Sequence, residues 1–180
     1  MMFYHCPYHS FDLKYRLAIY DGIHPKKMIK KVMGMLDERY CTDLGQGTQY
    51  KLEKRSDDWQ MSGEVAAQRH TGKGVNWKQY SKNQEYIYSI IQKCNDRGIQ
   101  VILLTTPTYI TYREHLPKEV LEVKDELCNK LQNTFDNVVY LNMLDDSRFV
   151  PDDFFDADHL NEFGAQKLTY ILNDFIQRNQ

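Results

Sequence analysis

The sequence predicts an α/β fold in which a parallel sheet carries helices on both faces. Two short aliphatic runs have the length and composition of buried parallel strands, and amphipathic helical patterns lie before, between and after them. This alternation is typical of an open α/β sheet, which binds ligands at the carboxyl ends of its strands. The chain of 180 residues, 42% of them apolar, is long enough for one such domain with a single core.

The first 76 residues contain one predicted helix and a longer irregular segment. Residues 25–40 have apolar side chains at helical spacing, and Pro25 stands in the first turn. Residues 41–76 have a different composition. Glycines recur among polar side chains, and Trp59 and Trp77 are the main apolar anchors. We expect this second segment to be loop-rich, as a surface loop or an active-site lid.

A helix and a buried strand follow at residues 77–105. The helix is predicted over 77–96 and stops at Gly98. Its apolar stripe consists of Tyr80, Ile87, Ile90, Ile91 and Cys94. Residues 99–105 are aliphatic and β-branched and end before Pro107, which is the pattern of a strand buried on both faces.

The remaining elements complete a βαβ unit and add a last helix. A helix opens at Pro117, and residues 138–141 form a second short aliphatic strand. The final helix spans residues 162–178, with one apolar side. Asn161 suits its N-cap, and Gly164 would let the helix start pack closely against a neighbouring strand.

Two loops follow the predicted strands and are therefore candidate sites. The first is the Thr-Thr-Pro-Thr-Tyr segment at residues 105–109, and the second spans residues 142–159. The second loop is acidic and contains Asp145, Asp146, Asp152, Asp153, Asp156 and Asp158. At its end, Asp156 stands three residues before His159, so its carboxylate can accept the Nδ1 proton of the imidazole. The other ring nitrogen is then free to act as a general base.

The longer pattern around this pair, FFDADHLNEFGAQKL, resembles the final motif block of SGNH (GDSL-type) hydrolases. The preceding stretch, NQEYIYSIIQKCNDRGIQVILLTTPTY, resembles the helix and strand before that block in relatives of polysaccharide acetyltransferases and cell-envelope esterases. The resemblance covers residues 77–178, and residues 1–76 diverge from it. It implies one three-layer α/β/α sandwich with a five-stranded parallel sheet over residues 1–180. It also implies hydrolysis or transfer of acyl esters, with Asp156 as the orienting carboxylate and His159 as the general base and acid.

The chain departs from this family in its first half. SGNH hydrolases carry a Gly-Asp-Ser type nucleophile motif after their first strand, and no such motif precedes residue 77. Ser10 is a weak candidate, because residues 1–10 resemble the tail of a central strand. We expect the chain to correspond to the C-terminal half of the domain, without the central first strand. The sheet would then have an unpaired apolar edge, which a second copy of the chain could cover. A catalytically incomplete binding or assembly module is the alternative.

The composition of the chain limits the classes of partner that we expect. Lys and Arg number 23 against 25 Asp and Glu, which gives no electrostatic reason for a nucleic-acid partner. No apolar run is long enough to span a membrane, and the N-terminal residues lack a secretory signal. From this sequence we expect a cytoplasmic protein, or part of a cell-envelope protein if the chain is truncated. The expected substrate is a small ester or an acylated carbohydrate.

No cofactor is indicated, and a metal site is a second alternative. The acidic loop has the oxygen ligands that suit Mg²⁺ or Ca²⁺, but not at motif spacing. His5, Cys6 and His9 also have ligand chemistry without a complete set. Four cysteines without a CxxC pair are expected to be small buried apolar residues: Cys6, Cys41, Cys94 and Cys128. The pairs Arg69 with His70 and Arg113 with His115 are expected at the surface, outside the catalytic group.

Overall fold

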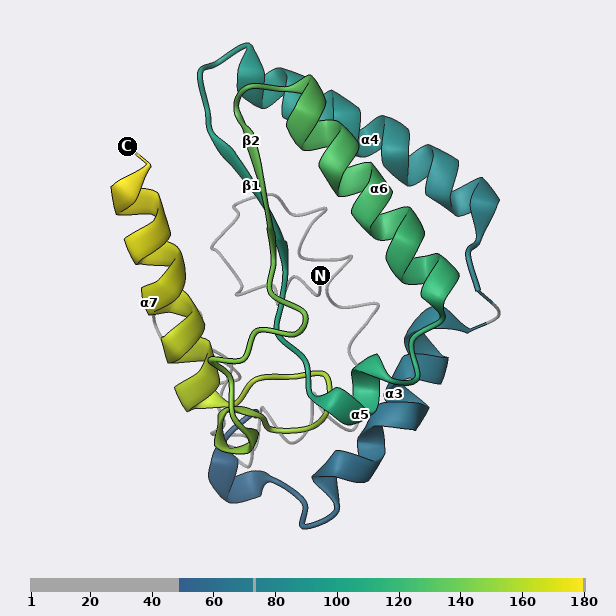
Figure 1. Ribbon diagram of the computed structural model, residues 1–180, viewed down its shortest axis with the longest axis vertical. Helices are drawn as coiled ribbons and strands as arrows, with labels where there is room; N and C mark the ends of the chain where they lie inside the picture. Colours follow the sequence, from purple (N-terminus) through teal and green to yellow (C-terminus); the bar gives the residue numbers. More distant parts are fainter. Residues whose placement is uncertain (1–48, 73, 180) are drawn as a thin grey trace, which may run out of the picture. The chain divides into compact units, whose positions relative to one another are not determined.

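The computed structural model describes residues 49–72 and 74–179, and the residues from Tyr50 onward form one compact unit (Figure 1). Several predictions fall outside these described residues. They are the helix over 25–40, the weak nucleophile candidate Ser10, the cysteines Cys6 and Cys41, and the ligand candidates His5 and His9.

Two parallel strands form the sheet of the described residues. Strand β1 (Val101–Thr105) pairs with β2 (Val138–Asn142) in a register that sets Val101 opposite Val138. Helices α5 (Ile110–Arg113) and α6 (Lys118–Thr134) connect the two strands. The predicted α/β class and the βαβ unit are therefore confirmed. Strand β1 begins two residues later than predicted, and its residues are half-buried rather than fully buried.

Helices lie on both sides of this strand pair. Figure 1 shows α4 (Trp77–Asn95) and α6 along one side and α7 (Glu162–Arg178) on the other. The buried core on the first side joins Ile91 of α4, Leu131 of α6 and Val138 of β2. Within the predicted stripe of α4, Ile90 is an exception, because 60% of it is exposed.

The helix ends agree with the predicted caps. Gly98 follows α4 with a φ of 65°, a left-handed conformation that glycine adopts without strain. Pro117 is the N-cap residue of α6. The Asn161 side chain accepts hydrogen bonds from the N–H groups of Phe163 and Gly164 at the start of α7.

Residues 41–76 contain a helix that the sequence does not predict. Helix α3 (Ser62–Thr71) follows two short 3-10 turns, η1 (Leu52–Lys54) and η2 (Trp59–Met61). It buries only small residues, Gly63, Ala66 and Ala67, so it lacks the large aliphatic stripe on which helix prediction depends. A Cβ atom at Gly63 would lie 2.4 Å from the carbonyl carbon of Thr111, which shows how closely α3 approaches α5.

The two tryptophans differ in burial, contrary to the prediction that both are apolar anchors. Trp59 is 7% exposed and contacts the rings of Tyr109 and Phe154, whereas Trp77 is 54% exposed at the start of α4. Trp59 is therefore the anchor of the first segment. It holds the chain before α3 against the loops that follow both strands.

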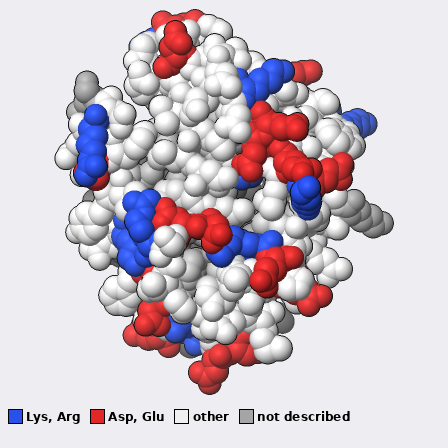
Figure 2. Space-filling view, viewed as in Figure 1, with Lys and Arg blue, Asp and Glu red and all other residues white. Residues whose placement is uncertain are grey.

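Surface charge and helix composition are the structural features that bear on the expected partners. On the face seen in Figure 2, basic side chains lie beside acidic ones and do not gather into one basic patch. Among the helices of the described residues, none combines the length and the apolar composition needed to cross a bilayer.

Candidate functional site

The loops that follow β1 and β2 meet beyond the carboxyl ends of the strands. The backbone N–H of Tyr109, in the first loop, donates to the carbonyl oxygen of Ala157 at 2.9 Å. The N–H of Thr108 donates to the carbonyl oxygen of Leu144 at 3.2 Å. The two candidate loops thus form one structural unit, in the place where open α/β sheets carry their ligands.

Residues 154–160 form a tight loop that holds the candidate pair. An antiparallel bridge joins Phe154 to Leu160, and the N–H of Phe155 donates to the carbonyl oxygen of His159 at 2.9 Å. Ala157 stands at the tip and is fully buried. Its N–H donates to the hydroxyl of Ser62 at 3.1 Å, so the first residue of α3 helps to fix the tip.

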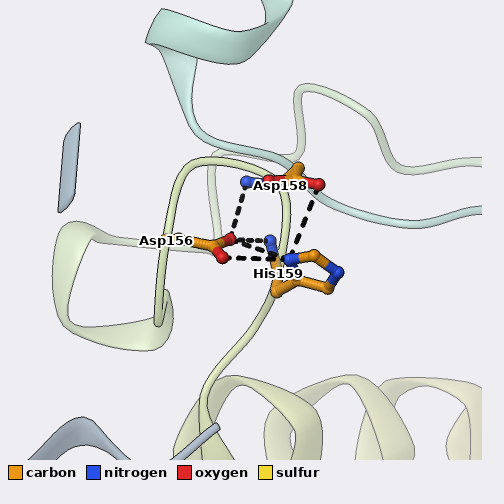
Figure 3. A group of neighbouring side chains, drawn as sticks. All are labelled: Asp156, Asp158 and His159. Atoms are coloured by element: carbon orange, nitrogen blue, oxygen red, sulfur yellow. Dashed lines mark hydrogen bonds and ion pairs between the residues drawn. The ribbon is translucent and has the colours of Figure 1, made fainter. Parts of the chain in front are cut away.

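Asp156 and His159 form the predicted carboxylate–imidazole pair (Figure 3). The imidazole Nδ1 lies 2.9 Å from one carboxylate oxygen of Asp156 and 3.1 Å from the other. The first oxygen also accepts the backbone N–H groups of Asp158, at 3.1 Å, and His159, at 2.8 Å. One carboxylate therefore fixes both the turn and the orientation of the ring.

The other ring nitrogen of His159 is available for chemistry. Figure 3 shows Nε2 directed away from both neighbouring carboxylates, and within residues 49–72 and 74–179 no hydrogen bond reaches it. Tyr50 stacks on the imidazole at 4.8 Å between ring centroids, with 24° between the planes. Phe155 contacts Tyr50 edge-on. The ring is thus held on its Nδ1 edge and on one face, and its side chain is 35% exposed.

A second carboxylate, Asp158, lies beside the same nitrogen. One of its oxygens is 3.5 Å from Nδ1 of His159, and its side chain is only 6% exposed. The hydrogen bond to Asp156 and the nearby Asp158 favour the imidazolium and raise the pKa of His159 to about 10. The site as it stands holds a positively charged His159 at neutral pH.

This raised pKa predicts how the stability of the fold depends on pH. The imidazolium is favoured in the folded state, so its contribution is complete below the ordinary pKa of 6.5 and is lost as pH rises through about 10. For His159→Gln we expect the free energy of unfolding to fall by about 1–2 kcal/mol near pH 6. The loss is no larger because the ring is partly solvated. Urea unfolding at pH 6, 8 and 10 should show that the stability difference between wild type and variant becomes smaller as the pH rises. A constant difference would contradict the assignment.

The serines of the described residues are not paired with His159. Within that part of the chain, no serine hydroxyl forms a hydrogen bond with His159. Ser62 is linked to the loop that carries His159, because its hydroxyl donates to the carbonyl oxygen of Trp59 at 2.6 Å and accepts the N–H of Ala157. A cavity of about 310 Å³ beside Asp156 is lined in part by Ser62, but not by His159.

Most of the acidic loop residues have structural partners. Asp153 is buried and pairs with Lys167 of α7, Asp146 pairs with Arg148, and Asp145 pairs with Arg113 at 2.5 Å. These pairs engage three of the carboxylates that the alternative of an Mg²⁺ or Ca²⁺ site would use. Arg113 also donates to the carbonyl oxygens of Thr108 and Leu144, so it links the two loops.

One smaller group in the described residues has the spacing that a metal ion needs. Ligand atoms of Asp156, Asp158 and His159 all lie within 4.8 Å of one another. An ion bound there would have to replace the Nδ1 proton that Asp156 now accepts. We therefore assign the group to the carboxylate–imidazole pair.

Several side chains that surround this pair are not indicated by any pattern in the sequence. Tyr50 lies in a segment without periodicity, and no sequence pattern indicates that it stacks on His159. Arg69 and His70 are exposed, as expected, but both lie near Asp158, at 3.6 and 3.7 Å. Their proximity depends on α3, which the sequence does not predict.

Comparison with known proteins finds no matching family model, no matching curated protein and no matching solved structure. The resemblance to SGNH hydrolases therefore stays a prediction based on the motif residues.

Proposed function

We propose that this chain is an SGNH-type hydrolase relative that hydrolyses or transfers acyl groups on a small ester or an acylated carbohydrate. The observation that carries the proposal is the pair at the carboxyl ends of the strands. Asp156 holds Nδ1 of His159 at 2.9 Å and leaves Nε2 without a hydrogen bond in the described residues. This is the arrangement by which a carboxylate orients a catalytic imidazole.

In the proposed reaction, a serine hydroxyl attacks the acyl carbonyl while Nε2 of His159 takes its proton. The resulting imidazolium then returns the proton to the departing alcohol, and water or a second hydroxyl completes the cycle. Asp156 stabilises the imidazolium throughout. The raised pKa of His159 means that the neutral base becomes abundant only at alkaline pH.

The nucleophile and the full sheet belong to the same proposal. We propose a three-layer α/β/α sandwich, of which β1 and β2 with α4, α6 and α7 form one part. The nucleophile would come from outside the described residues, with Ser10 as the weak candidate in this chain. A second copy that covers a sheet edge is the proposed partner, since open edges invite pairing.

Turnover of p-nitrophenyl acetate by the purified full chain tests this proposal. We expect activity above that of the His159→Ala variant, increasing from pH 7 toward pH 10, and abolished by a serine-directed fluorophosphonate. Activity equal to the His159→Ala background at every pH would overturn the proposal for this chain. That outcome would favour the alternative of a catalytically incomplete binding or assembly module.

A further inference from the structure

The environment of Asp158 extends the site beyond the carboxylate–imidazole pair. Its side chain is 6% exposed, and the same oxygen, Oδ2, lies near three basic groups. The distances are 3.5 Å to Nδ1 of His159, 3.6 Å to the guanidinium of Arg69 and 3.7 Å to Nε2 of His70. A desolvated carboxylate needs positive partners, and here three groups share one oxygen.

The two histidines approach this carboxylate from different parts of the fold. His159 belongs to the loop after β2, whereas Arg69 and His70 stand in the last turn of α3. On its other edge, His70 has Nδ1 at 3.0 Å from the hydroxyl of Tyr112 in α5. The charged and titratable groups that face Asp158 are thus Arg69 and His70 from α3, Tyr112 from α5, and His159 with Asp156 from its own loop.

We propose that Asp158 is a positioning residue shared between His159 and His70, through which the end of α3 controls the charge of the site imidazole. This inference rests on the proposed role of His159, but it concerns the ionisation of the ring and not turnover. Asp156 accepts the Nδ1 hydrogen bond at 2.9 Å, and Asp158, with an oxygen 3.5 Å from the same nitrogen, adds a second negative partner for the imidazolium.

The contacts of Arg69 indicate how this control operates. A guanidinium nitrogen of Arg69 lies 3.4 Å from Nε2 of His70, and both groups lie within 3.7 Å of the Asp158 oxygen that faces His159. Because the positive charge of Arg69 shares this carboxylate with His159, it makes the imidazolium of His159 less stabilised. The end of α3 therefore opposes the effect of Asp158 on the ring.

Titration of the histidine Cε1–H signals by NMR tests this inference on the labelled full chain without substrate. Asp158→Asn keeps the size of the side chain and removes its charge, so the titration midpoint of His159 should fall by about 1–2 pH units. Arg69→Gln should raise this midpoint by about 0.3–0.5 pH units, because it removes a competing positive charge near Asp158. Asp152→Asn is the matched control, because that carboxylate lies in the same loop but is 86% exposed.

The two variants move the midpoint in opposite directions, which a general loss of structure would not do. An unchanged midpoint in folded Asp158→Asn would overturn the inference. If that variant fails to fold, the exposed Arg69→Gln decides, and an unchanged or lowered midpoint there would also overturn it. A shifted midpoint in a chain without esterase turnover would support the coupling and reject the proposed function.

Discussion

Exchanging Asp156 for asparagine is expected to lower ester turnover by about 10²- to 10⁴-fold, the range that assistance by an oriented general base supplies. The amide oxygen of asparagine can still accept the backbone N–H groups of Asp158 and His159, so the turn is retained. The amide has no charge to stabilise the imidazolium that forms when Nε2 takes a proton. Steady-state rates with p-nitrophenyl acetate, compared at the pH optimum of each variant, measure the effect.

Two further variants separate chemistry from folding in this experiment. Asp156→Ala removes the acceptor of both backbone N–H groups, so it should lose stability as well as turnover. Asp152→Asn should leave turnover and stability unchanged, since the Asp152 carboxylate is exposed and its ion pair with Arg55 is long, at 3.7 Å. Wild-type turnover in folded Asp156→Asn would show that the pair does not act as a catalytic carboxylate and imidazole.

The parallel strand pair and the three long helices after residue 76, α4, α6 and α7, could be predicted because each has a hydrophobic pattern that matches its type of element, whereas the sequence does not predict the short helix α5. Residues 101–104 are aliphatic, and Val101 and Leu103 pack against the core that joins α4, α6 and β2. Helix α7 begins after Asn161, because the amide oxygen of that residue caps two N–H groups. Helix α3 could not be predicted in the same way. It is stabilised by close approach to α5 through Gly63, Ala66 and Ala67, and small residues leave no hydrophobic periodicity.

The same difference applies to the candidate site. The contact between Asp156 and His159 is local, because a separation of three positions within one turn brings the carboxylate and the imidazole together. The sequence therefore predicts this contact. The contacts of Asp158 with Arg69 and His70 join parts of the chain about 90 residues apart. Such contacts depend on how α3 is placed. No local pattern in a single sequence contains that information.

Replacing Gly164 with alanine is expected to lower the free energy of unfolding by about 1–3 kcal/mol, as overpacking does. A Cβ atom at this position would lie 2.1 Å from the carbonyl oxygen of Asp153, which belongs to the 3-10 turn η3 (Pro151–Asp153). The sequence predicts close packing at Gly164, but against a strand, whereas the partner is this turn. The clash outweighs the gain of about 1 kcal/mol in helix propensity that alanine brings.

The turn cannot move aside without disturbing the candidate site. The Asp153 carbonyl oxygen accepts the N–H of Asn161 at 2.9 Å, and the residues between them include the Phe154–Leu160 bridge that closes the loop of His159. Urea unfolding should therefore show a large loss for Gly164→Ala, together with a changed His159 titration. Gln166→Ala, on the exposed side of the same helix, should stay within about 0.5 kcal/mol of wild type. Equal stability of the two variants would contradict the close contact between Gly164 of α7 and the Asp153 carbonyl oxygen of η3. The loop of Asp156 and His159 would then be fixed by its other contacts, with Ser62 and Tyr109.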